Sequence, residues 1–163
     1  MKYLLPAALT LVILGLSQVM GVSEEVAVAE VVDGDTINTE NDTVRFLGVD
    51  TPETSSISEN RPQDFGLEND SETVKCLDRY GIKASKFVEN NTGENITLVY
   101  DRESDDRGQY GRKLAYIRAD NDINRKLVVK GLARVYPSGF SRWNEFYFWQ
   151  YVAKKNDRGV WSC

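Results

Sequence analysis

The 163-residue chain has no histidine and only two cysteines, Cys76 and Cys163. The missing histidine excludes every triad or general base built on an imidazole, and two cysteines without histidine cannot complete a structural zinc site. A basic excess is also lacking, because 25 Asp and Glu face 20 Lys and Arg, a formal net charge of −5. Any chemistry on phosphates must therefore rely on local positive charge rather than on an overall attractive field.

Long apolar runs are confined to the start of the chain, where a mostly apolar run over residues 4–16 follows Lys2. The run is shorter than the roughly 20 residues of a membrane-spanning helix and is typical of the hydrophobic region of a signal peptide. We therefore expect residues 1–21 to be a signal peptide cleaved near Val19-Met20-Gly21, and the protein to be secreted or extracytoplasmic at the cell surface. An uncleaved N-terminal membrane anchor is the alternative.

The two cysteines are compatible with export. In an oxidising compartment a Cys76–Cys163 disulfide would close a loop of about ninety residues and stabilise the fold by roughly 4–5 kcal/mol in the chain-entropy treatment. Such a bond would also fix the C-terminal tail. Two unrelated thiols are the alternative.

Residues 22–163 have the length of one domain. Alternating apolar residues bounded by turn signals predict five strands, at residues 26–32, 36–39, 43–49, 96–100 and 114–119. Pro52 removes a backbone donor and is expected to end the third strand. The first three strands should form an antiparallel meander.

Helical signals follow in three places. One helix is predicted from Asp78 or Tyr80 to Thr92, a second from an Asp122 cap to Gly131, and a third over residues 142–156. Before the first helix, residues 55–76 are predicted to be a long, acidic, exposed loop with no catalytic role. The third helix carries an aromatic series whose helical spacing favours burial over a base-stacking platform: Trp143, Phe146, Phe148, Trp149 and Tyr151.

Acidic side chains are concentrated in residues 32–54. Five of them are expected to cluster once the strands pair: Asp33, Asp35, Asp42, Asp50 and Glu53. Such oxygen ligands suit calcium or magnesium better than a softer metal. Aspartates at strand ends are also common turn formers, so spacing alone leaves the metal site and the turns as alternatives.

Two arginines add local positive charge. Arg45 lies in the middle of an apolar strand, where it could form a buried salt bridge to Asp35 or Asp50 or hold two oxygens of a phosphate. Arg112 follows Gly111, and a tight turn at this glycine could direct the arginine over the barrel. A solvated Arg112 is the alternative.

Three motifs carry a resemblance to the staphylococcal nuclease (thermonuclease) family: VVDGDT, RFLGVDTPET and YGRKLAYI, in this order and at these separations. The resemblance extends over about residues 28–161. It implies an α+β fold, a five-stranded Greek-key β-barrel of the OB-fold type with about three packed α-helices. It further implies a monomeric, calcium-dependent endonuclease. Such an enzyme hydrolyses the P–O5′ bond of DNA and RNA, single-stranded or frayed, and leaves 3′-phosphate ends.

The resemblance also implies a calcium site. Asp35 and Asp50 match the carboxylate ligands of Ca²⁺, and Thr51 matches the residue that binds the ion through its backbone carbonyl. Asp33 and Thr36 belong to the same motif and are expected to support these ligands.

The catalytic and substrate-binding residues follow from the same motifs. Glu53 matches the residue that orients or deprotonates the attacking water, and Arg45 and Arg112 match the two phosphate-binding arginines. Tyr110 matches a tyrosine of the nucleotide pocket, and Tyr136 is expected to extend that pocket.

Two alternatives to the nuclease come from other functional classes. A non-catalytic nucleic-acid-binding module would keep the barrel but lose carboxylates or arginines, whereas every catalytic position is filled here. A carbohydrate- or peptide-binding barrel has only the fold in its favour. The long acidic loop and the cysteine pair depart from the general family pattern, which leaves substrate affinity and base preference open.

Overall fold

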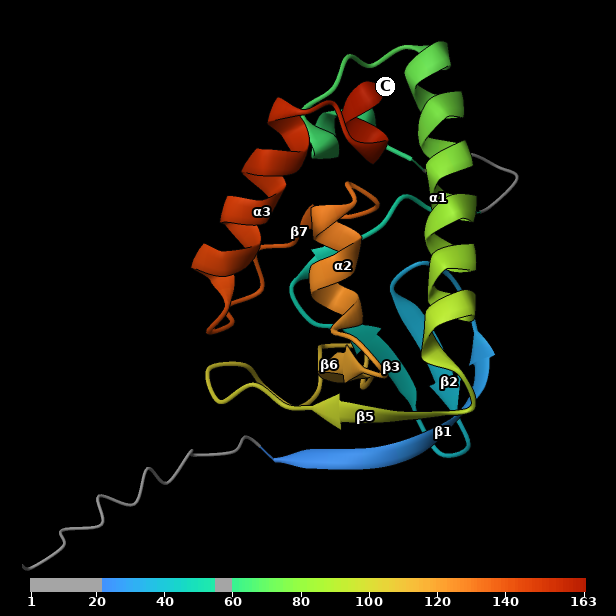
Figure 1. Cartoon of the computed structure of the whole chain (residues 1–163), viewed down its shortest axis with the longest axis vertical. Helices are drawn as coiled ribbons and strands as arrows, with labels where there is room; N and C mark the ends of the chain where they lie inside the picture. The colour runs from blue at the N-terminus through green and yellow to red at the C-terminus, as the bar shows by residue number, and fades with distance from the viewer. Residues whose placement is uncertain (1–21, 55–59) are drawn as a thin grey trace, which may run out of the picture.

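The computed structural model describes residues 22–54 and 60–163 (Figure 1). The predicted leader and residues 55–59 of the predicted loop lie outside the described residues. The strands are β1 Ser23–Val31, β2 Thr36–Thr39, β3 Thr43–Phe46, β4 Val49–Asp50, β5 Asn95–Val99, β6 Lys113–Arg118 and β7 Arg134–Val135. The helices are α1 Ser71–Thr92, α2 Ile123–Val129 and α3 Trp143–Lys155, with short 3-10 helices η1 Pro62–Phe65 and η2 Gly159–Ser162. No helix in the described ranges is long and apolar enough to cross a membrane.

Five strands close a barrel in the order β1-β2-β3-β6-β5. The pairs are antiparallel except β3 with β6, which are parallel, with Val44 beside Lys113 and Phe46 beside Ala115. The three helices lie together over one side of this barrel (Figure 1). The predicted α+β fold, a five-stranded OB-type barrel with three packed helices, is therefore confirmed.

Alternation along β3 separates the core from the site. Val44 and Phe46 are buried in the barrel at 0% and 1% exposure, whereas Arg45 between them points to the other face. On the helical side, buried Asn124 of α2 accepts from Ile117 N at 2.8 Å and donates to Leu47 O at 2.9 Å. Asn124 therefore fixes α2 against the end of β3, just before the chain enters the site.

The predicted third strand is interrupted. It was expected to run to Val49, but the ladder ends at Phe46, and Gly48 adopts φ +75°, which favours glycine. A Cβ at Gly48 would also lie 2.6 Å from the Phe140 ring. The turn redirects the chain into β4, which pairs with β7 in a separate two-stranded sheet.

The first helix begins earlier than predicted. Its first residue is Ser71, and the Asp70 carboxylate accepts from the backbone N of Glu72 and of Thr73, each at 2.8 Å. Asp70 is thus a regular N-cap. The prediction of a loop up to residue 76 was wrong because this cap is hidden in a run of polar residues.

Residues 60–76 also do not form an exposed loop. A second hydrophobic cluster packs η1 against α1, α3 and η2, and its buried members are Phe65, Leu77, Ala153, Val160 and Trp161. Beside it, Cys76 and Cys163 form the expected disulfide, with a sequence separation of 87. Residues 60–76, called the inserted segment below, are therefore anchored to the helical layer, with only part of their surface exposed.

The aromatic series of α3 is only partly buried. Phe146 is fully buried, whereas Trp143, Phe148 and Tyr151 are 36%, 56% and 55% exposed. The prediction of a common core location was wrong for these three. Successive helical residues are rotated by about 100°, so closely spaced aromatic residues cannot all share one buried stripe.

Candidate active site

One cleft of about 680 Å³ collects most of the predicted site residues. The turn between β3 and β4, the loop over residues 108–112 and the segment over residues 136–138 form its walls. The predicted residues that line it are Asp33, Arg45, Asp50, Glu53, Tyr110, Arg112 and Tyr136. Asp35, Thr36 and Thr51 are buried, at 1%, 4% and 5% exposure. Asp35 contacts Arg45 of the cleft, and Thr51 and Thr36 contact Asp35.

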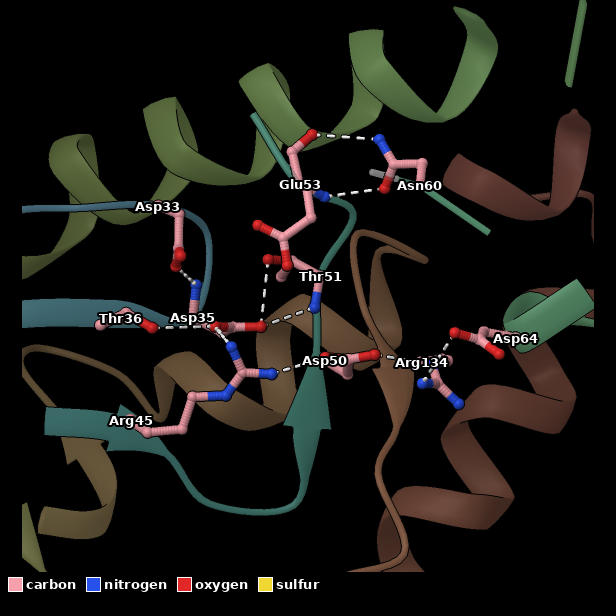
Figure 2. Close-up of polar contacts among 10 residues, drawn as sticks. All are labelled: Asp33, Asp35, Thr36, Arg45, Asp50, Thr51, Glu53, Asn60, Asp64 and Arg134. Carbon is pink, nitrogen blue, oxygen red and sulfur yellow. Dashed lines mark hydrogen bonds and ion pairs between the residues drawn. The ribbon is translucent and has the colours of Figure 1, made fainter. Parts of the chain in front are cut away.

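The centre of the site is Arg45, whose guanidinium lies between two carboxylates (Figure 2). Its Nη1 donates to Asp35 Oδ1, and its Nη2 donates to Asp50 Oδ1 at 2.5 Å. Asp35 lies immediately before β2, and the register of β2 with β3 places the next residue, Thr36, opposite Arg45. The two alternative salt bridges, to Asp35 and to Asp50, are thus present at once.

Asp35 is held on all sides. Its Oδ2 accepts from Thr51 N at 2.7 Å and from Thr51 Oγ1 at 3.2 Å, and its Oδ1 accepts from Thr36 Oγ1 at 3.1 Å. Asp33 Oδ1 accepts from the backbone N of Asp35 at 2.9 Å, which shapes the turn. Burial raises the pKa of Asp35, and the Arg45 guanidinium opposes this rise. A buried carboxylate of this kind is stable as an anion only beside a cation.

A second arginine, which the sequence analysis did not identify, contacts Asp50. β4 and β7 pair Asp50 directly opposite Arg134, and Arg134 Nε donates to Asp50 Oδ2 at 2.7 Å. Arg134 therefore approaches Asp50 from the side opposite Arg45 (Figure 2). Arg134 could have been recognised in the sequence by the criterion used for Arg45, because it is a charged residue within the apolar stretch Leu132-Ala133-Arg134-Val135.

Asn60 was also not predicted, and it fixes the backbone of Glu53. Its Oδ1 accepts from Glu53 N at 2.8 Å, and its Nδ2 donates to Glu53 O at 3.2 Å and to Asp78 Oδ1 of α1 at 2.7 Å. Gly81 of α1 permits the close approach, because a Cβ there would lie 2.4 Å from Glu53 O. The Glu53 side chain extends from this anchored backbone toward Thr51 (Figure 2).

The far wall of the cleft carries Arg112. Gly111 adopts φ +74°, and the turn is closed by Gly108 N donating to Arg112 O at 2.9 Å. The guanidinium lies 5.8 Å from the Tyr110 ring centroid, and Tyr110 is 77% exposed. The predicted glycine turn thus places Arg112 in the same cleft as Arg45.

The expected cluster of five acidic residues does not form. Asp42 lies at the end of the β2–β3 hairpin, where it forms ion pairs with Arg107 at 2.7 Å and Lys113 at 3.0 Å. Within residues 22–54 and 60–163, no three Asp, Glu or Cys side chains converge as a metal-binding group. Hairpin geometry directs Asp42 away, because it lies at the opposite end of β3 from Asp50.

The donors that remain are nevertheless those of a hard cation. Asp35 and Asp50 supply carboxylate oxygens, and Thr51, next to Asp50 in the chain, carries a backbone carbonyl as a further oxygen donor. A positively charged group, Arg45, already lies between the two carboxylates. The chemistry of the donor set and its affinity for positive charge therefore fit an ion such as calcium.

Fold and cleft together define a class: a small OB-type barrel with a carboxylate pair, a separate glutamate and several guanidiniums in one cleft. Residues 43–163 match the family described as staphylococcal nuclease homologue. The chain belongs to this family.

Individual relatives agree with this assignment. A thermonuclease of Staphylococcus hyicus is 34% identical over 143 residues, covering 83% of this chain and 74% of the relative. An uncharacterized protein of Methanocaldococcus jannaschii is 37% identical over 147 residues, covering 83% of this chain and 70% of the relative. The endonuclease YncB of Bacillus subtilis is 35% identical over 141 residues, covering 80% of this chain but only 58% of the relative.

Proposed function

We propose that this protein is an exported, calcium-dependent endonuclease that hydrolyses DNA and RNA at the P–O5′ bond and leaves 3′-phosphate ends. Family membership makes the chain a phosphodiester-hydrolysing nuclease acting on nucleic acid. The observation that supports the finer proposal is the convergence of Glu53, Arg45 and Arg112 beside the Asp35–Asp50 pair. A monomer is sufficient for this arrangement, since one chain supplies every residue.

The proposed reaction can proceed without histidine, because other side chains can stabilise the phosphate charge and accept the proton. Attack on a phosphodiester builds negative charge on the phosphate oxygens, which Arg45 and Arg112 would stabilise by charge-assisted hydrogen bonds. Glu53 would accept the proton of the attacking water as a general base. Asn60 forms hydrogen bonds with Glu53 N and O, which fix the backbone from which the carboxylate extends.

Asp35, Asp50 and the carbonyl of Thr51 would hold the calcium ion, which supplies Lewis-acid stabilisation of the phosphate oxygens when bound. Arg45 donates one N–H to Asp35 Oδ1 and one to Asp50 Oδ1, and its other N–H groups would be available to a phosphate oxygen. Arg134 would help to orient Asp50, because it donates to the other carboxylate oxygen.

Unpaired nucleic acid is the substrate form that we propose. Tyr110 and Tyr136 are 77% and 46% exposed at the cleft, and exposed rings can stack on unpaired bases. The net charge of −5 offers no general attraction to duplex DNA. Export through residues 1–21 is part of the proposal and is tested by N-terminal sequencing of the protein recovered from the medium of an expressing culture.

The decisive experiment is cleavage of single-stranded DNA and RNA by the purified protein with calcium, magnesium or a chelator, followed by analysis of the product ends. We expect activity with calcium, none with the chelator, and 3′-phosphate ends. Undiminished cleavage in the chelator would refute the metal assignment, and 5′-phosphate ends would refute the proposed bond.

Two variants test the catalytic roles. Glu53→Gln and Arg112→Ala are expected to lower kcat by about two to four orders of magnitude, the typical loss for a general base or a charge-stabilising donor. The matched controls are Glu68→Gln and Arg79→Ala, which make the same charge changes at exposed positions outside the cleft. Binding without cleavage by the parent protein would favour the non-catalytic binding module instead.

A further inference from the structure

A second cleft, of about 740 Å³, lies next to the first. It shares three lining residues with the first cleft, Asp50, Glu53 and Tyr136. Its other wall is the inserted segment, beginning at Asn60 and Arg61, together with Arg134 of β7. The two clefts therefore meet at the carboxylates to which we assign the reaction.

The second cleft resembles the first in its chemistry. It contains two guanidiniums, those of Arg61 and Arg134, as the first contains those of Arg45 and Arg112. The Arg134 guanidinium lies 5.5 Å from the Phe65 ring centroid and 5.8 Å from that of Tyr136. Phe65 is buried, whereas the Tyr136 ring is 46% exposed. A cation beside an exposed aromatic ring is a combination with which proteins hold single-stranded nucleic acid.

The wall of this cleft is preformed. Asn60 is fixed by hydrogen bonds to Glu53 and Asp78, and Phe65 packs 6.2 Å from Trp161 in the second hydrophobic cluster. Arg61 lies between these two anchored residues, immediately before η1. Its position relative to Glu53 is therefore set by the fold.

The two arginines of this cleft differ in their ion pairs. Arg134 is committed to Asp50 and lies 3.9 Å from Asp64 Oδ2. Arg61 is exposed, and none of the carboxylates in the described ranges forms an ion pair with it. Arg61 is thus the cation of this cleft that is available to a polyanion.

We propose that the second cleft is a subsite for single-stranded polynucleotide, taking the nucleotides on the far side of the scissile phosphate from the Tyr110–Arg112 pocket. Arg61 binds a backbone phosphate there, and Tyr136 offers its ring to a base. The inference rests on the proposed nuclease function and adds a substrate class to it. Chains that extend on both sides of the cleaved bond are bound better than a dinucleotide.

Binding tests the subsite without requiring cleavage. In a Glu53→Gln background, fluorescence anisotropy with calcium measures Kd for labelled oligothymidylates, a dinucleotide and a chain of about ten nucleotides, within the usual span of an OB-fold site. Arg61→Ala is expected to raise Kd for the longer chain by about 5–10-fold and to lower the slope of log Kd against log salt by about 0.7, the effect of losing one phosphate contact. The dinucleotide Kd should equal that of the control Arg79→Ala.

Cleavage by the proteins with Glu53 intact separates the two proposals. We expect Arg61→Ala to raise KM for the longer chain while its kcat/KM on the dinucleotide equals that of Arg79→Ala. Identical values for Arg61→Ala and Arg79→Ala on both substrates and in the salt slope would overturn the subsite. A parent protein that binds the longer chain in an Arg61-dependent way but cuts nothing would overturn the nuclease proposal and leave the subsite standing.

Discussion

Replacing Asn60 by alanine isolates the positioning of Glu53 from its chemistry. The substitution removes three hydrogen bonds, to Glu53 N, Glu53 O and Asp78 Oδ1, and removes no side chain to which we assign a catalytic step. Glu53 keeps its carboxylate but loses the clamp on its backbone. We therefore expect catalysis to fall because the general base is displaced.

The magnitude follows from the count of bonds. At about 1 kcal/mol for each buried hydrogen bond, the three together contribute about 2–3 kcal/mol of stability. In a chain of this length each kcal/mol corresponds to about 2–4 °C, so Tm should fall by about 5–10 °C. A small displacement of a catalytic group costs about 10–100-fold in rate, and we expect this loss in kcat.

Steady-state kinetics well below Tm separates the two effects. The loss should appear in kcat with KM nearly unchanged, because a general base acts in the transition state. Asn69→Ala, an exposed asparagine in the same inserted segment, is the matched control and should match the parent. An Asn60→Ala protein that is destabilised but turns over at the parent rate would show that Asn60 supports only the fold, and the positioning argument would fail.

Two further predictions concern stability. Breaking the Cys76–Cys163 bond, by Cys76→Ser or by reductant, should lower the unfolding free energy by about 4–5 kcal/mol. The kcat measured well below Tm should be retained, because neither cysteine lines the cleft. An unchanged Tm would contradict this prediction. Burial tends to raise the pKa of Asp101, but hydrogen bonds from Tyr116 and Ser141 outweigh it and hold that pKa below its ordinary 3.8. Because the folded-state pKa is lowered, the stabilisation is complete at neutral pH and is lost as pH falls below about 4. Asp101→Asn should therefore lower the unfolding free energy by about 1–3 kcal/mol at pH 7. Urea titrations should show that this difference from the parent becomes smaller in acid. A difference that does not change with pH would refute the role of the Asp101 charge.

Much of the barrel could be predicted because its signals are local. Alternating residues and Asp122, which caps α2, gave elements close to those observed. The errors occurred where packing between distant segments determines the local structure. Gly48 interrupts the strand with a φ of +75°, and Phe140 fills the space that a side chain at position 48 would need. No property of residues 43–49 alone contains that contact.

The inserted segment shows the same limit more clearly. Phe65 is buried in a cluster with residues distant in sequence, among them Trp161 near the far end of the sequence. A polar run with a single aromatic residue resembles a loop until its distant partner is known, so the prediction of an exposed loop was wrong. The aromatic residues of α3 were misjudged for the converse reason, since packing in the described structure leaves Phe148 and Tyr151 56% and 55% exposed.

The predicted site residues converge because three motifs fix their spacing, but their partners did not follow from sequence. Arg134 reaches Asp50 through the β4–β7 ladder, and Asn60 reaches Glu53 across the insertion. Both contacts join segments distant in sequence or separated by irregular chain. Long-range pairing of this kind leaves no periodic pattern in the sequence from which it could be predicted.

The parallel seam between β3 and β6 has a consequence for folding. Parallel neighbours cannot be joined by a tight hairpin, and closing a long intervening segment makes such pairing slow. Arg45 lies on one side of this seam, and Arg112 directly precedes the strand on the other side. The two guanidiniums therefore come together when this seam forms, so activity should return during refolding no earlier than the pairing of β3 with β6.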